Sequence, residues 1–147
     1  MTPTIRRSVA ALVLSLPFGL VGSADAAGEK QTFRATLNGT SEVPSNQTKG
    51  TGEVTATYDP GTRTLSWKGS YSGLTGSVTA AHFHGPAAPG QNAGVLIPAP
   101  AATSPFEGSA ALDEAKAADL LAGKLYFNIH TAENPKGEIR GQVERAP

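Results

Sequence analysis

Three histidines are the residues of this sequence whose type and spacing favour metal chemistry. The chain contains three histidines and no cysteine, so a metal site must use nitrogen or oxygen ligands. His82 and His84 stand two residues apart in an expected strand over residues 77–84. Alternation places both imidazoles on one face, about 6.6–7 Å apart along the strand, and Phe83 on the other. Both rings can therefore converge on one metal ion at bond lengths of about 2 Å.

The third histidine, His130, ends a second expected strand over residues 124–130. Apolar and polar residues alternate there, which places His130 on the face opposite to Phe127. If the two strands lie side by side, the three histidines form a three-imidazole site. Imidazole ligands without sulfur suit Cu(II), Zn or Ni, and the stability order makes Cu(II) the most tightly bound and zinc the less favoured ion.

The spacing singles out no fourth ligand. An open coordination position is therefore expected, as in catalytic or exchangeable sites and unlike closed structural zinc sites. The alternative interpretation is that His82 and His84 are exposed imidazoles at a strand end that bind nothing, with His130 unrelated to them.

The rest of the sequence consists of elements that must position these side chains. Segments rich in Thr, Val, Tyr, Phe and Ile, separated by Gly, Pro and Asn, predict an all-β fold: a Greek-key β-sandwich or flattened barrel of about eight strands. The segments are residues 32–38, 51–58, 62–71, 77–84, 93–97, 106–110, 124–130 and 138–144.

Two local patterns set the ends of elements. Asp59-Pro60-Gly61 predicts a hairpin turn in which Pro60 presets φ and Gly61 supplies a positive φ. One short helix over residues 113–122 is expected, with Asp113 as its cap and Gly123 ending it.

The first 26 residues read as a signal peptide. Arg6 and Arg7 form a positive start, an apolar stretch covers residues 9–21, and Ala24-Asp25-Ala26 fits the A-x-A cleavage pattern. The arginine pair leaves both general and twin-arginine export open. The apolar stretch is too short to span a bilayer, which needs about 20 apolar residues. We therefore expect a periplasmic or secreted protein with a single domain over residues 27–147 and no membrane span.

The charge balance argues against nucleic acid as a partner. The chain has 12 basic and 12 acidic residues, so no excess positive charge is present to bind a phosphate backbone. The absence of cysteine also excludes disulfides and cysteine nucleophiles.

The sequence resembles the chordin-domain (CHRD) family over residues 32–144. The resemblance rests on five segments, which are residues 37–44 (LNGTSEVP), 73–74 (GL), 81–87 (AHFHGPA), 128–131 (NIHT) and 137–142 (GEIRGQ). It implies an immunoglobulin-sized all-β extracellular module and does not name a reaction. A metal-free extracellular protein-interaction module is the alternative function that this resemblance favours.

The order of the histidines is also similar to that in copper/zinc superoxide dismutase. The similarity implies that His82, His84 and His130 hold copper and that Arg140 guides an anionic substrate. Arg140 shares a strand face with Glu138, and without a metal the two would form a surface ion pair. The bridging histidine, the zinc ligands and the cysteines of that family have no counterpart here. The site is therefore expected to hold a single copper ion, for copper handling or superoxide-type redox chemistry, and the missing bridge leaves dismutase activity an open question.

Overall fold

The computed structural model describes residues 28–147, and the expected signal peptide over residues 1–26 lies outside them. The described chain forms nine strands, one 3₁₀ helix and one α-helix. In chain order they are β1 (Gln31–Asn38), η1 (Gly39–Ser41), β2 (Thr51–Asp59), β3 (Thr64–Ser72), β4 (Val78–His84), β5 (Val95–Pro98), β6 (Phe106–Ala111), α1 (Glu114–Leu121), β7 (Tyr126–Thr131), β8 (Ile139–Gln142) and β9 (Glu144–Arg145).

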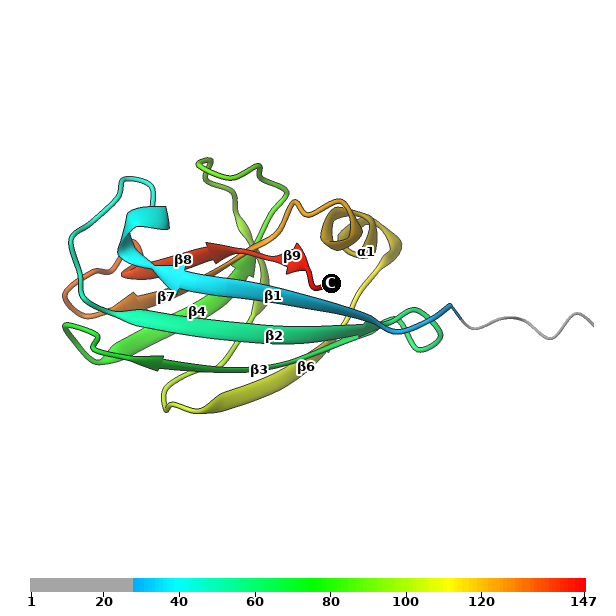
Figure 1. Cartoon of the computed structure of the whole chain (residues 1–147), viewed down its shortest axis with the longest axis horizontal. Helices are drawn as coiled ribbons and strands as arrows, with labels where there is room; N and C mark the ends of the chain where they lie inside the picture. The colour runs from blue at the N-terminus through cyan, green and yellow to red at the C-terminus, as the bar shows by residue number, and fades with distance from the viewer. Residues whose placement is uncertain (1–27) are drawn as a thin grey trace, which may run out of the picture.

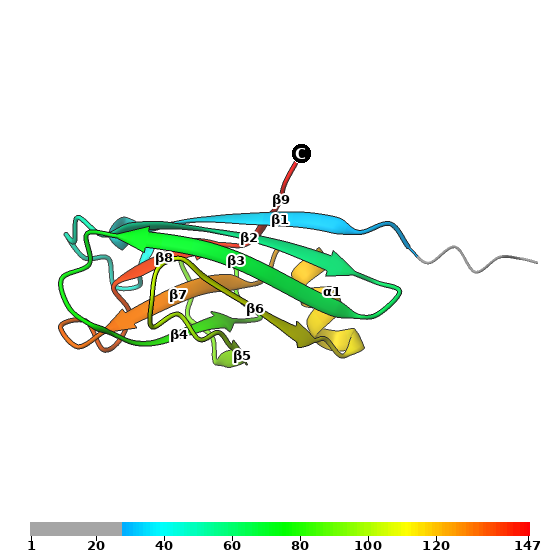
Figure 2. The same cartoon turned by 90° about the horizontal axis from the view of Figure 1, so that it is seen from below.

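The strands form a flattened antiparallel barrel, as predicted. Their spatial order is β5-β4-β7-β8-β1-β2-β3-β6, with β9 paired to β1. One layer contains β1, β2, β3 and β6 and the other contains β5, β4, β7 and β8, as the two views in Figures 1 and 2 show. The layers join where Asn38 of β1 pairs with Arg140 of β8. The chain passes from the first layer to the second after β3, back to the first at β6, and again to the second at β7. Strands that are neighbours in space, such as β4 and β7, are therefore far apart in the sequence.

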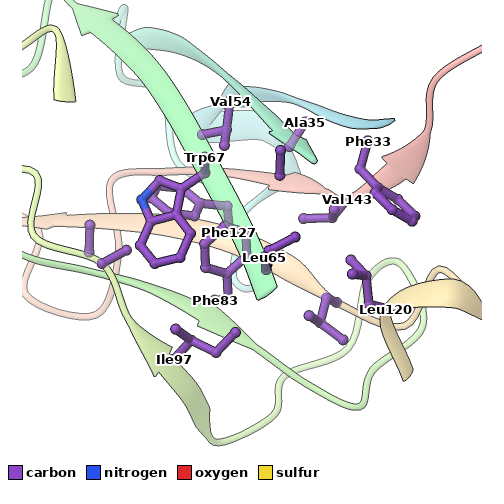
Figure 3. Close-up of a cluster of buried hydrophobic side chains, with 14 of the residues drawn as sticks. Phe33, Ala35, Val54, Leu65, Trp67, Phe83, Ile97, Leu120, Phe127 and Val143 are labelled. Atoms are coloured by element: carbon purple, nitrogen blue, oxygen red, sulfur yellow. The ribbon is translucent and has the colours of Figure 1, made fainter. Parts of the chain in front are cut away.

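The apolar core fills the space between the layers. Trp67 of β3, Phe83 of β4 and Phe127 of β7 point into it and are almost fully buried (Figure 3). Phe83 packs edge-on against both partners, with ring centroids 5.1 Å from Trp67 and 4.8 Å from Phe127. Because Phe83 points into the core, its two histidine neighbours project from the outer face of β4, as alternation requires.

The hairpin between β2 and β3 forms where Asp59-Pro60-Gly61 predicts it, but the expected backbone conformation is wrong. Arg63, not Gly61, has the positive φ, at 53°. The Asp59 carboxylate accepts hydrogen bonds from the N–H groups of Gly61 (2.9 Å) and Thr62 (3.2 Å). This side-chain turn holds the start of the loop at negative φ, so the chain reverses into its second strand at Arg63.

The short helix α1 forms between β6 and β7 with the expected ends. The Asp113 side chain caps it by accepting a hydrogen bond from the Lys116 N–H at 2.8 Å. Gly123 follows the helix with a φ of 69°, the left-handed conformation that ends many helices. Leu120 is fully buried against the core. Within residues 28–147, no helix has the length and apolar character of a membrane span.

Candidate metal centre

The three histidines come together on the outer face of two paired strands. β4 and β7 are antiparallel neighbours, and their register pairs Ala80 with His130, His82 with Asn128 and His84 with Tyr126. One ring nitrogen from each histidine lies within 4.8 Å of the others. The strand adjacency on which the three-imidazole interpretation depends is therefore present.

His130 and His82 contact each other directly. The Nδ1 of His130 lies 3.0 Å from the Pro135 carbonyl oxygen. Because a carbonyl oxygen only accepts, this Nδ1 carries the proton and the Nε2 of His130 holds a lone pair. That Nε2 lies 3.3 Å from the Nδ1 of His82, which donates to it. A metal ion bound here would replace this hydrogen bond.

His84 contributes a lone pair that has no partner. Its Nδ1 donates to the carbonyl oxygen of Ala93 at 3.0 Å, which leaves Nε2 unprotonated. This Nε2 is buried and forms no hydrogen bond in the described residues. Buried polar atoms are nearly always satisfied, so an unpaired ring nitrogen beside two other imidazoles is the strongest structural sign of a ligand site.

The surroundings keep the β4 histidines neutral. Burial lowers the pKa of His82, and the neighbouring His130 lowers it further. Burial also lowers the pKa of His84, and the positive charge of Arg140 lowers it further. The hydrogen bond to Ala93 raises this pKa but does not outweigh burial. Neutral imidazole is the form that binds metal ions.

The spacing of the nitrogens fits a tetrahedral metal site for one pair and requires a small movement for the third. Bonds of about 2.0–2.1 Å at tetrahedral angles place two nitrogens about 3.3 Å apart. The contact between His82 and His130 has this length, at 3.3 Å. The widest separation in the set, up to 4.8 Å, must contract on binding. The described cluster includes no carboxylate, which is consistent with an open coordination position.

Arg140 lies near the histidines but is not a surface residue. Only 2% of its surface is exposed. Its guanidinium donates to Asn92 Oδ1 at 2.9 Å and to the Gln91 carbonyl, both in the loop between β4 and β5. It also lies over the ring of Tyr126, with Cζ 3.4 Å from the ring centroid. An anion in solvent therefore cannot contact this guanidinium directly.

The expected surface ion pair between Arg140 and Glu138 is wrong. Glu138 is fully buried and accepts hydrogen bonds from the hydroxyl groups of Thr48, Thr75 and Thr131 and from the Thr75 N–H. Hydroxyl and amide donors from two loops and from the end of β7 satisfy this carboxylate, so it does not need Arg140.

Sequence reasoning missed the buried polar residues beside the histidines. Asn128 donates to the Glu42 carboxylate at 2.6 Å. Burial raises the pKa of Glu42 to about 7, although Arg140 and the Asn128 hydrogen bond oppose the rise. Gly137, at a φ of 129°, allows this approach, because a Cβ there would lie 2.6 Å from Glu42 Oε1. The alternation of Tyr126, Asn128 and His130 was the available signal for a polar outer face.

Comparison with protein-family models gives one match relevant to this arrangement. The CHRD domain model matches residues 33–143, which include all three histidines and most of the described chain. The chain belongs to the CHRD domain family. CHRD domains are typical of extracellular and periplasmic proteins. The comparisons with curated proteins and with solved structures gave no match.

Proposed function

We propose that this CHRD-domain protein is exported and binds one copper ion through His82, His84 and His130. The observation that carries the proposal is the buried, unpartnered Nε2 of His84, which lies beside two further imidazoles. The carbonyls of Ala93 and Pro135 accept hydrogen bonds from two of the rings and so orient them, as carbonyls behind ligating histidines do in metalloproteins. Copper is favoured over zinc because an all-imidazole donor set binds Cu(II) most tightly.

Two uses of such an ion fit the open position. The first is copper handling, in which the ion is stored or passed to another protein. The second is superoxide-type chemistry, for which copper supplies reversible one-electron transfer: one superoxide is oxidised to dioxygen, and a second, with two protons, is reduced to hydrogen peroxide. In this second use Arg140 contributes a positive potential from behind Tyr126, without contacting the anion.

The test is metal analysis and electron paramagnetic resonance of the protein comprising residues 27–147. Wild type is expected to bind one Cu(II) with nitrogen hyperfine structure. His82→Ala, His84→Ala and His130→Ala are each expected to weaken binding by more than about tenfold. Thr79→Ala, an exposed substitution on the same strand, is the matched control and should bind copper normally. Unchanged binding in all three histidine variants would exclude this site.

A groove on the opposite layer favours a second candidate function, that of a metal-free interaction module. The groove has a volume of about 800 Å³. Residues 100–103, Pro105 and Phe106 form one side, and Glu53, Lys68 and Glu107 add charge. Selecting peptides that bind the copper-free protein from a peptide library tests this function. Binding that is lost in Lys68→Glu and kept in His84→Ala would support it, and failure to select any groove-dependent peptide would count against it.

A further inference from the structure

The aromatic ring of Tyr126 lies between a proposed metal ligand and a buried cation. Its ring stacks on the imidazole of His84, with centroids 4.8 Å apart and planes 1° from parallel. The guanidinium of Arg140 lies over the same ring, 3.4 Å from its centroid. All three side chains are at most 8% exposed, so little water separates them.

The sheet register places His84 and Arg140 on opposite sides of Tyr126. His84 belongs to β4 and Arg140 to β8, and these strands flank β7 on its two edges. Tyr126 pairs with His84 across one edge, and across the other edge it pairs with Gln142, two residues beyond Arg140. The order is therefore imidazole, phenol ring, guanidinium, with the cation one ring removed from the ligand.

The charge of Arg140 is not cancelled by a direct partner. Its hydrogen-bond acceptors, Asn92 Oδ1 and the Gln91 carbonyl oxygen, are both neutral. The ion pairs formed by the described residues, Lys30 with Asp59 and Lys116 with Asp113, do not include it. The carboxylate that does act on it, Glu42, is held by Asn128 instead.

We propose that Arg140, acting through the Tyr126 ring on His84, shifts the relative affinity of the three-histidine site towards Cu(I) and away from Cu(II). This inference rests on the proposed copper site and assigns a specificity-determining residue to it. A fixed positive charge repels both ions, and the Coulomb energy is proportional to the charge of the ion. The repulsion of Cu(II) is therefore twice that of Cu(I), and low exposure keeps solvent from screening it.

Removing the charge should strengthen both affinities unequally. In Arg140→Gln, the Cu(II) dissociation constant is expected to fall about tenfold and that of Cu(I) about threefold, since the larger factor is the square of the smaller. Because Cu(II) gains more affinity than Cu(I), the reduction potential of the bound copper should also fall. The fall is about 59 mV for each tenfold change in the ratio of the Cu(II) and Cu(I) dissociation constants. Competition with chelators specific for Cu(I) and for Cu(II) measures both constants.

Three further variants separate charge from structure. Arg140→Lys keeps the charge but not the planar group, and should stay close to wild type. Arg34→Gln removes the same charge from an exposed position on β1 and should leave the ratio unchanged. Glu42→Gln, measured at pH 8, removes a negative charge and should shift the ratio in the opposite direction, towards Cu(I). If Arg140→Gln does not fold, as judged by circular dichroism, the neutral variant Arg140→Met is measured in its place, with the same expected shift.

Equal changes in both affinities for Arg140→Gln, or the same shift in Arg140→Lys, would overturn the inference while the copper site stands. Failure of wild type to bind copper through the histidines would instead overturn the proposed function. The two failures are distinguishable because the histidine variants report on the site and the Arg140 variants report only on the balance between its two ions.

Discussion

The β4 histidines are held in the neutral form that a metal ion requires. Burial lowers the pKa of both His82 and His84 below the ordinary value of 6.5. A free imidazole starts to lose metal affinity to protons as the pH falls through that value. Here proton competition begins at lower pH, so copper affinity should change little between pH 7.5 and 6.5 and fall steeply below. Copper dissociation constants measured from pH 7.5 to 4.5 check this, and a steep loss already above pH 6.5 would contradict it.

The pKa of Glu42 is raised, whereas the pKa values of His82 and His84 are lowered, so we expect a different effect of pH at this residue. Its pKa is raised to about 7, from 4.5 in the unfolded chain, mainly by burial. The folded state therefore binds the proton more tightly, and stability is lost as the pH rises from about 4.5 through 7. Glu42→Gln mimics the protonated form and keeps an oxygen that can accept from Asn128.

We expect Glu42→Gln to raise the free energy of unfolding at pH 8 by about 2 kcal/mol. The difference from wild type should shrink towards zero near pH 5, where Glu42 of the folded wild type is protonated and therefore neutral, like the glutamine of the variant. Urea unfolding at the two pH values measures it. Glu53→Gln, on the other layer, is the control and should show no such pH dependence. A destabilised variant at pH 8 would mean that the attraction between the Glu42 carboxylate and the charge of Arg140 outweighs the cost of burial.

The clustering of the three histidines could be predicted from the sequence, whereas the surroundings of the cluster could not. Period-two alternation assigns His82 and His84 to one strand face, and this requires only local geometry. The burial of Arg140 depends on the loop between β4 and β5, which folds over the outer face and supplies the carbonyl of Gln91. Alternation assigns a residue to a face but does not say whether a distant loop covers that face.

At the level of elements, Glu138 connects loops that are far apart in the sequence. Its carboxylate accepts from Thr48 and Thr131 at 2.6 Å each and from the Thr75 N–H at 2.8 Å. Burial alone would raise the pKa of Glu138, but these hydrogen bonds lower it. The charged form therefore fastens the loops before β2 and before β4, and the end of β7, to the loop between β7 and β8 in which Glu138 lies. That loop also contains the Pro135 carbonyl that orients His130.

Glu138→Gln should destabilise the protein by about 3 kcal/mol. The amide keeps the shape but turns one acceptor into a donor that faces existing donors, and hydrogen bonds to a buried charge are worth more than neutral ones. Urea unfolding at pH 7 measures the loss. Glu133→Gln, an exposed change in the loop after β7, should stay within about 0.5 kcal/mol of wild type. Equal stability of the two variants would contradict the role given to Glu138.

The elements themselves follow from local patterns, and their order in space does not. The cap at Asp113 and the stop at Gly123 are short-range features, so the helix could be predicted closely. The expected strand over residues 138–144 is divided into β8 and β9, which pair with β1 at separate points: Arg140 with Asn38, and Glu144 with Arg34. The pairing of β4 with β7 joins residues almost fifty positions apart, and no local pattern encodes it.

Across the whole molecule, the core and the histidine cluster lie on opposite faces of the same two strands. Phe83 and Phe127 bury their rings between the layers, while the histidines project outward from β4 and β7. The core therefore does not need a metal ion to form. In this respect the protein differs from zinc fingers, in which metal binding provides the folding free energy.

This separation predicts a folded metal-free protein that copper stabilises further. An ion bound only by the folded state adds about 2.7 kcal/mol at a free concentration one hundred times its dissociation constant. For a domain of this size, that corresponds to an increase in Tm of about 10 °C. Thermal unfolding followed by circular dichroism, with and without Cu(II), measures the increase, and a chelator should reverse it. His84→Ala should remain folded and lose most of the increase, because it removes the buried nitrogen that has no other partner. An unfolded metal-free protein, or an increase in Tm that His84→Ala retains in full, would show that copper acts elsewhere on the chain.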